Sequence, residues 1–407
     1  MDKVTEKAKQ MLDHAGIEIN GSRPYDIQVH NDKLFKRVFS QGDLGLGESY
    51  MDGWWDVEQL DEFFYRVIAA KLQQVMKRDW VTMFELARAQ IFNLQKAKRA
   101  FEVGQKHYDV GNDLYRAMLD KRMTYTGALW EHTDNLDDAQ EAKLDLVCRK
   151  LDLKPGQRVL DIGCGWGSFA GYAAEKYGVS VVGVTVSKEQ VTLGNEMYQH
   201  LPVELRLQDY RDVDEKFDHI VSLGMIEHVG RKNYRTYMKV VDRCLEEEGR
   251  FVLQTIGHNQ SLKAASPWTE RYIFPNSMLP SIRLLGTSAE KLFTMEDWEN
   301  IGANYDPTLM AWFRNFDSSW DTLKHNYSDR FYRMWKYYLL TSAGSFRARR
   351  IQLWQILFTK TGLPGGYKRV SRQRVTQQEK PAVDGKHDTS VADMKPATGN
   401  GLKKIRH

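Results

Sequence analysis

Short apolar runs alternate with amphipathic stretches between residues 158 and 257 of the chain. The apolar runs predict strands at 158–163, 180–187, 203–210, 218–224 and 250–257, and the stretches between them have helical spacing at 168–178, 188–201 and 232–246. Strands separated by helices of this length imply right-handed crossovers and a mostly parallel sheet with helices on both faces. A later apolar run at 351–360 is expected to rejoin the sheet. The pattern predicts an α/β fold with a doubly wound sheet.

The rest of the chain divides by composition into further segments. The first 75 residues combine turn-forming glycines with apolar bulk, including Trp54 and Trp55, which we expect to pack in a core. Apolar residues recur at helical spacing between 78 and 103, whereas the chain after 258 is irregular and rich in aromatic residues. From about 371 it is polar and short of aromatic residues, which favours disorder. We expect an N-terminal domain at 1–75, a basic helical linker at 76–106, a catalytic domain at 107–370 and a disordered tail at 371–407.

Composition excludes several protein classes. The chain has 407 residues, of which 42% are hydrophobic and 28% charged, as in ordinary globular proteins. A membrane span needs about 18–20 consecutive apolar residues, and no run approaches that length. The N-terminal residues lack the apolar stretch of a signal peptide, so we expect a cytoplasmic protein. The three cysteines, Cys148, Cys164 and Cys244, lack metal-binding spacing, so neither a metal site nor a disulfide framework is expected.

The positive charge is concentrated in two segments. Net charge is only +4, but residues 71–106 carry eight Lys/Arg against three acids, and residues 368–407 carry ten against four. Basic segments on an acidic body favour docking to an anionic partner such as a lipid surface or a nucleic acid. Two solvated surface segments would have the same composition, so charge alone leaves both interpretations open.

The sequence DIGCGWG, between the strand at 158–163 and the helix at 168–178, is typical of a nucleotide-binding turn. Glycines at Gly163 and Gly165 let the backbone approach a ligand where a Cβ atom would clash. The spacing differs from the dinucleotide-binding motif, and Asp161 precedes the first glycine by two residues. A carboxylate there suits a cationic ligand, such as the amino group of S-adenosylmethionine, better than a pyrophosphate.

Two neighbouring strands end in residues that suit an adenosyl ligand. Thr185, at the end of one strand, and Gln190 just beyond it can both hydrogen-bond ribose hydroxyl groups. The next strand ends at Gln208 and Asp209, where a carboxylate can accept a hydrogen bond from an adenine amino group. Ligands of such sheets bind outside the carboxyl ends of the strands, so these turns are expected along one edge.

Several stretches from about residue 15 to about residue 360 resemble the cyclopropane-fatty-acid synthase family, in the family's order. They are GDLGLGESYMDGWW, KHYDVGNDLYRAMLD, VLDIGCGWG, GVTVSKEQ, IVSLGMIEHVG, YIFPN, MAWF and IQLWQ. The resemblance implies a class I methyltransferase (Rossmann-like) domain, a small N-terminal lipid-associated domain, S-adenosyl-L-methionine as cofactor and a cis double bond of a phospholipid acyl chain as substrate. It also implies that the cofactor is surrounded by Tyr108, Tyr125, Thr126, Gly163, Gly165, Thr185, Gln190 and Asp209.

The family's reaction requires an apolar pocket. Methyl transfer to an alkene leaves a carbocation, which is best held among aromatic side chains and away from water. The aromatic residues that could form this pocket lie in the irregular region after residue 258: Trp268, Tyr272, Phe274, Trp312, Phe313 and Phe316. Any single one of them is better interpreted as a core residue.

Ring closure also requires a base that removes a proton from the added methyl group. The resemblance implies a bicarbonate ion held by a Cys, a Glu, a His, a Tyr and a backbone amide. Glu227 and the amide of Ile256 are present here, but Gly127, Gln254 and Phe313 stand where the family has Cys, His and Tyr. Hydrogen bonds to a buried anion contribute roughly 1.5–3 kcal/mol each. Their loss argues against a bicarbonate site of the family's type in this chain.

The departures leave several chemical outcomes open. Without the family's base, a hydride shift and the loss of a different proton would yield a methyl-branched or methylene chain. Glu227 or His228 could instead act as the base, or Gln254 could reshape an anion site that still works. His228 could equally be a structural residue at the start of a helix.

We therefore interpret the chain as an enzyme that alkylates cis-unsaturated phospholipid acyl chains with S-adenosyl-L-methionine at an anionic membrane surface. The resemblance further implies a homodimer. A small-molecule N-methyltransferase, a nucleic-acid methyltransferase and a non-catalytic lipid-binding protein are the alternatives. We expect no nucleic-acid partner, because no RNA-binding module is recognisable.

Overall fold

The computed structural model describes residues 3–72, 111–262 and 266–372. The expected linker at 76–106, the cofactor candidate Tyr108 and all but the first two residues of the expected tail lie outside these ranges. No helix within them is both long enough and apolar enough to cross a membrane.

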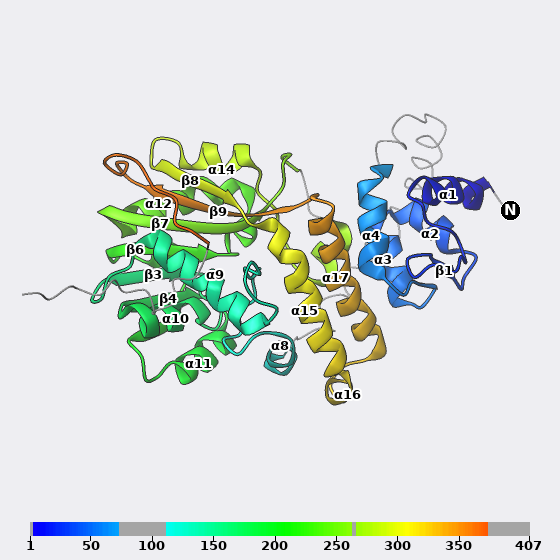
Figure 1. Ribbon diagram of the computed structural model, residues 1–407, viewed down its shortest axis with the longest axis horizontal. Helices are drawn as coiled ribbons and strands as arrows, with labels where there is room; N and C mark the ends of the chain where they lie inside the picture. The colour runs from blue at the N-terminus through cyan, green and yellow to red at the C-terminus, as the bar shows by residue number, and fades with distance from the viewer. Residues whose placement is uncertain (1–2, 73–110, 263–265, 373–407) are drawn as a thin grey trace, which may run out of the picture. The chain divides into compact units, whose positions relative to one another are not determined.

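A seven-stranded sheet in the order β5-β4-β3-β6-β7-β9-β8 forms the centre of the catalytic region (Figure 1). Its strands are β3 (Arg158–Ile162), β4 (Ser180–Thr185), β5 (Val203–Leu207), β6 (Phe217–Leu223), β7 (Leu245–Gly257), β8 (Thr294–Asn300) and β9 (Gln352–Thr359). The first five in spatial order pair in parallel, and β9 runs antiparallel between β7 and β8. The prediction of a doubly wound, mostly parallel sheet is confirmed, and all six expected strands are present.

Helices cover both faces of this sheet (Figure 1). One face packs against α9 (Leu136–Leu151) and α10 (Ser168–Tyr177), and the other against α12 (Tyr234–Cys244) and α14 (Ile282–Ala289). α11 (Lys188–Met197) connects β4 to β5, and the preceding residue, Ser187, caps the helix by accepting a hydrogen bond from the Gln190 amide. α10 ends at Gly178, whose positive φ of 66° suits glycine.

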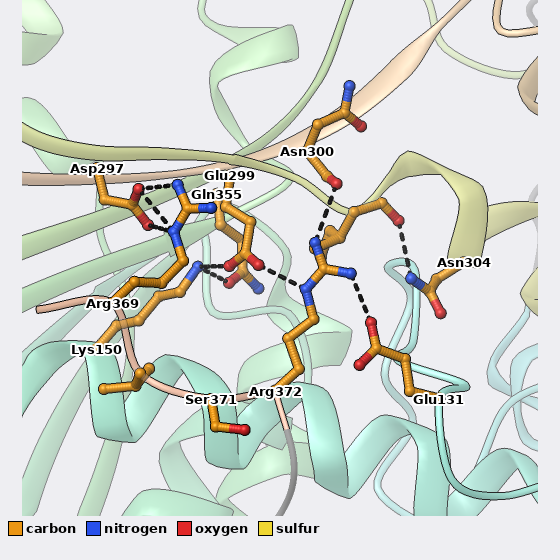
Figure 2. Close-up of polar contacts among 12 residues, drawn as sticks. Glu131, Lys150, Asp297, Glu299, Asn300, Asn304, Gln355, Arg369, Ser371 and Arg372 are labelled. Atoms are coloured by element: carbon orange, nitrogen blue, oxygen red, sulfur yellow. Dashed lines mark hydrogen bonds and ion pairs between the residues drawn. The ribbon is translucent and has the colours of Figure 1, made fainter.

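β8 is a strand that the sequence did not predict. Its sequence, TMEDWEN, carries three acids and therefore lacks an apolar run. Asp297 and Glu299 are nevertheless buried, because Arg369, Lys150 and Arg372 pair with their carboxylates (Figure 2). Residues far away in the sequence thus make this strand possible.

The expectation of irregular chain after residue 258 is wrong. Most of that region is helical: α13 (Pro267–Tyr272), α14, α15 (Tyr305–Ser318), α16 (Trp320–Leu323) and α17 (Asp329–Arg347). Its aromatic residues recur three or four positions apart, as with Trp312 and Phe316 or Phe331 and Trp335, and all four of these are buried. Helix faces carry large rings at this spacing when they pack against one another.

The N-terminal segment packs on this helical layer. It contains α1 (Lys3–His14), β1 (Gln28–Val29), α2 (Leu34–Gln41), α3 (Asp43–Met51), β2 (Trp55–Asp56) and α4 (Leu60–Ala69). Helices α3 and α4 contact α17, and Gly344 allows the close approach because a Cβ atom there would lie 2.6 Å from the Asp61 carbonyl oxygen. Trp55 is fully buried, in agreement with its expected core position.

Candidate active site

A cavity of about 980 Å³ lies at the carboxyl edge of the parallel strands. Its walls include the turns that follow β3, β4, β5 and β6, where ligands of doubly wound sheets bind. Each cofactor candidate within the described ranges lines this cavity, namely Tyr125, Thr126, Asp161, Gly163, Gly165, Thr185, Gln190, Gln208 and Asp209. Folding thus gathers residues from across about 85 positions of sequence around one space.

The two glycines after β3 serve different purposes. Gly163 has a φ of 79°, and a Cβ atom there would lie 2.5 Å from Met225 Cγ, so this glycine permits tight packing of the turn. Gly165 has a φ of 56°, and a Cβ atom there would meet no atom within 4 Å. Since Gly165 lines the cavity, its missing side chain leaves room for a ligand.

Asp161 faces a buried lysine that the sequence analysis missed. Lys143 of α9 lines the same cavity, and its Nζ donates to Thr126 Oγ1 at 2.9 Å. Burial raises the pKa of Asp161 to about 7 and lowers the pKa of Lys143 to about 7, while the opposite charge of each opposes these shifts. The available signal was the spacing of Lys143 from Ala139 and Val147, which places it on the buried face of its helix.

The residues expected near the sugar and the base already interact locally. Thr185 Oγ1 donates to Gln190 Oε1 at 2.7 Å, and Gln208 Nε2 donates to a backbone oxygen at 3.1 Å. The Asp209 carboxylate accepts from the guanidinium of Arg211 at 2.6 Å, which lowers the pKa of Asp209. A ligand that bonds to Asp209 must therefore share its carboxylate with Arg211.

Glu227 presents a buried carboxyl group with one oxygen available. Its Oε1 accepts from the Ile256 backbone N–H at 2.7 Å, where the ladder between β6 and β7 has ended. Its Oε2 is buried without a hydrogen-bond partner among the described residues. Burial raises the pKa of Glu227 to about 7, which suits a group that exchanges protons near neutral pH. His228 lines the cavity, and burial lowers its pKa.

The three departures from the resembled family are not among the residues that line the cavity. A Cβ atom at Gly127 would lie 2.8 Å from Leu353 Cδ2 and 3.1 Å from Tyr305 Cδ1, so these side chains fill the position of a thiol. Gln254 is fully buried, and its Oε1 accepts from Gln355 at 2.9 Å. Phe313 is half-buried on α15 and packs in the helical layer. The residues that line the cavity include none of these three, nor Glu227 or Ile256.

Aromatic side chains close one side of the cavity. Tyr125 and Phe274 line it, with ring centroids 6.5 Å apart, and Trp312 lies 5.2 Å from the Tyr125 ring. The Tyr125 hydroxyl is hydrogen-bonded to that of Tyr338 at 2.9 Å. Tyr338 and Tyr115, whose ring is 5.2 Å from that of Tyr125, were missed because a helical aromatic stripe resembles ordinary core.

The other aromatic candidates lie elsewhere in the fold. Trp268 packs against Gly47 and the Tyr337 ring, and Tyr272 donates to Glu48 of α3. Phe316 stacks on Tyr332. These residues pack helices against one another. Of the six expected aromatic residues only Phe274 lines the cavity, together with Tyr115 and Tyr125 from outside that set, while Trp312 packs against the Tyr125 ring.

The sequence matches the family model for mycolic acid cyclopropane synthetase over residues 95–356. The chain belongs to this family. The cyclopropane-fatty-acyl-phospholipid synthase of Escherichia coli K12 is 54% identical over 361 residues, which is 89% of this chain and 94% of that enzyme. A probable fatty acid methyltransferase of Pseudomonas putida is 36% identical over 62% of this chain and 68% of its own length.

Solved structures of the cyclopropane synthetase family share the catalytic fold. The cyclopropane synthase MmaA2 of Mycobacterium tuberculosis superposes with a TM-score of 0.60 at 30% identity, over 64% of this chain and 98% of its own. The mycolic acid cyclopropane synthase CmaA1 complexed with SAH and CTAB gives 0.59 at 32% identity, over 64% and 98%. These matches confirm the class I methyltransferase fold.

Proposed function

We propose that this protein uses S-adenosyl-L-methionine to convert cis double bonds of phospholipid acyl chains into cyclopropane rings. The observation that carries the proposal is the 54% identity with the E. coli synthase, which extends over 89% of this chain. A relative matched only in its cofactor fold would not share sequence over so much of the chain. The cavity, its glycine turn and the adjoining aromatic rings supply what such a reaction requires.

The cavity fits the cofactor. Gly165 leaves open space where its side chain would stand, and Asp161 places a buried carboxyl group opposite Lys143. We assign the amino-acid end of S-adenosyl-L-methionine to the Asp161 side, the ribose to Thr185 and Gln190, and the adenine to Gln208 and Asp209. Tyr125 and Thr126 complete the site, and Tyr108 is assigned to it by family resemblance.

The bound cofactor supplies an electrophilic methyl group to the alkene. Tyr125 and Phe274 face the cavity with their rings, so they exclude water and stabilise positive charge on the acyl chain. In the part of the chain that the structure describes, Glu227 Oε2 has no hydrogen-bond partner. We assign Glu227 as the base that accepts the proton released when the ring closes. His228 is the second candidate for this proton.

The described residues do not fit a bicarbonate held by the resembled family's full ligand set. Gly127 and Phe313 provide no hydrogen bond, and the Ile256 amide already donates to Glu227. Gln254 retains one free donor. The same three departures favour a second candidate function, in which the enzyme makes a methyl-branched or methylene acyl chain without closing a ring.

Trideuteromethyl S-adenosyl-L-methionine distinguishes these products. We expect the enzyme to give cyclopropane rings that retain two deuterium atoms when it is incubated with vesicles of cis-unsaturated phospholipid, as measured by mass spectrometry and NMR of the released acyl chains. A methyl branch that retains three deuterium atoms, or a methylene group that retains two and gives alkene signals in the NMR spectrum, would establish the second function instead. Absence of label from lipid, with label in added amines, would contradict both.

Restoring the family residues is expected to create a bicarbonate requirement. In the triple variant Gly127→Cys, Gln254→His, Phe313→Tyr, the rate in carbonate-depleted buffer should rise several-fold on addition of bicarbonate, whereas the wild-type rate should not. To admit the added Cβ atom, the Leu353 side chain must move aside and Tyr305 must give way by a few tenths of an ångström. Gly286→Cys, where a Cβ atom meets nothing within 4 Å, controls for an added thiol. A triple variant that folds and ignores bicarbonate would refute this account of the departures.

We also propose where the enzyme works. Acyl chains of phospholipids reside in membranes, so the enzyme is assigned to the cytoplasmic face of the membrane as a peripheral homodimer. Residues 71–106, with eight Lys/Arg against three acids, are assigned to anionic lipids, at about 1 kcal/mol per near-surface cation.

A further inference from the structure

Polar side chains are buried in a row across three strands of the sheet. Gln254 of β7 is the cross-strand partner of Gln355 of β9, which in turn is the partner of Glu299 of β8. Lys150 reaches this row from α9 (Figure 2). All four side chains are at most 4% exposed, so each hydrogen bond in the row is made away from water.

The lysine fixes the direction of every hydrogen bond in the row. An ammonium group only donates, so Lys150 Nζ, at 2.8 Å, makes Gln355 Oε1 an acceptor. The other end of that amide, Nε2, then donates to Gln254 Oε1 at 2.9 Å. Gln254 is left with its NH₂ group as its free end. That nitrogen is buried and has no partner among the described residues.

The residue that carries the free donor is linked to the Glu227 segment through neighbouring backbone groups. The Gln254 carbonyl accepts from the Gly224 amide, and two residues further along β7 the Ile256 amide donates to Glu227. Both backbone groups therefore face the segment that carries Glu227. Glu227 Oε2 and Gln254 Nε2 are complementary, since one accepts, the other donates and neither has a partner in the described chain.

A second set of charges holds the lysine in place. Glu299 Oε2 lies 2.5 Å from Lys150 Nζ, and its other oxygen accepts from Arg372, which also pairs with Glu131 (Figure 2). Burial lowers the pKa of Lys150, and the Glu299 carboxylate opposes this effect. The ion pair with Glu299 thus favours the charged form of the Lys150 ammonium group, which burial disfavours.

We propose that Lys150, acting through Gln355, is a positioning residue that holds Gln254 as a hydrogen-bond donor to an anionic oxygen at the Glu227 site. The inference rests on the proposed function, because it assigns the oriented amide to the proton-transfer step. The anionic oxygen is that of Glu227 itself, or that of a small carboxylate-like anion beside it. In either case a donor stabilises the negative charge and an inverted amide would repel it.

Gln355→Glu tests the orientation with almost no change in shape. A carboxylate still accepts from Lys150 but cannot donate to Gln254, so the Gln254 amide must turn and present its oxygen to Glu227. We expect turnover to fall about tenfold, the acidic limb of the rate profile to move up by about one pH unit and KM for S-adenosyl-L-methionine to stay unchanged. Stopped assays across pH with labelled cofactor and unsaturated vesicles measure all three.

Few other groups near Glu227 titrate in the working range. Tyr234 and Tyr237 of α12 and Tyr305 of α15 face it, and burial raises the pKa of each. His228 follows it in sequence, and burial lowers its pKa. These tyrosines are therefore neutral between about pH 5 and 9, and the histidine is neutral above about pH 6.5. Asp161 and Lys143 line the cavity and also have pKa values of about 7, so a shift of the profile is assigned to the Glu227 site only where it is absent from the same variant carrying Glu227→Gln.

Two further variants separate orientation from charge and from folding. Gln355→Met frees the Gln254 amide to rotate without adding charge, so it should give a smaller change in the same direction. Arg369→Gln breaks the neighbouring ion pair with Asp297, outside the row, and should leave the profile at its wild-type position. A melting temperature near the wild-type value confirms that each variant folds.

Added bicarbonate identifies the anionic oxygen. If the Gln355→Glu profile shifts equally with and without bicarbonate, as a bicarbonate-independent wild-type rate implies, the donor acts on Glu227. If the wild type also responds to bicarbonate, against that expectation, and the variant needs more of it, the donor acts on a bound anion. Both results support the orienting role. A folded Gln355→Glu enzyme with wild-type pH profile, turnover and bicarbonate response would overturn it. Failure of wild-type enzyme to label lipid would instead reject the proposed function.

Discussion

Glu227→Gln is expected to lower the rate of ring closure by about 10²- to 10⁴-fold, the usual contribution of a general base. Burial raises the pKa of Glu227 to about 7, and the base is the ionised form, so the wild-type rate should rise with pH through about 7. The variant should lose this dependence, because an amide does not titrate there. Product formation from labelled cofactor across pH measures both effects.

The substitution is built to preserve the fold. Glutamine keeps the oxygen that accepts from the Ile256 amide, so cofactor affinity and melting temperature should stay close to wild type. His228→Gln is the matched comparison, since this residue is the other candidate base and lines the cavity. If His228→Gln loses activity while Glu227→Gln keeps nearly normal activity, His228 rather than Glu227 is the base.

Gly165→Ala is expected to weaken S-adenosyl-L-methionine binding by at least about tenfold, as measured by calorimetry. The added Cβ atom meets no protein atom within 4 Å, so it projects into the space that we assign to the cofactor. The φ of 56° costs an alanine about 1 kcal/mol, which lowers stability but leaves the protein folded. The affinity loss therefore reports on the ligand rather than on the turn.

Gly365→Ala provides the matched control. Gly365 also has a positive φ, 78°, and a Cβ atom there also meets nothing within 4 Å, but it does not line the cavity. Both variants should lose similar stability, and only Gly165→Ala should lose affinity. Equal cofactor affinities of Gly165→Ala and Gly365→Ala would show that S-adenosyl-L-methionine does not bind next to Gly165.

The strands of the sheet were predictable where burial on both faces demanded continuous apolar sequence. β3, β4 and β6 pack under helices on either side, and each contains three valine, leucine or isoleucine residues. β8 was not predictable, because its buried positions are acids whose charge is neutralised by Lys150, Arg369 and Arg372 from other parts of the chain. Local sequence does not reveal such a partner.

The residues of the site likewise divide into those that the sequence predicts and those that it does not. Gly163, Gly165 and Asp161 could be assigned from spacing alone, since a strand, a tight turn and a helix leave few residues able to touch a ligand. Lys143 and Tyr338 could not, because a buried lysine and a helical aromatic stripe are indistinguishable in sequence from a solvated charge and an ordinary core.

By itself the sequence determined the fold class, the place of the cofactor turn and the three departures at Gly127, Gln254 and Phe313. Only the tertiary structure decided what these departures mean: Leu353 and Tyr305 fill the space beside Gly127, and Lys150 orients Gln254 through Gln355. The physical reason is that a residue's type determines which hydrogen bonds it can make. Its neighbours in the folded structure determine which of its donors and acceptors remain unpaired and available to a ligand.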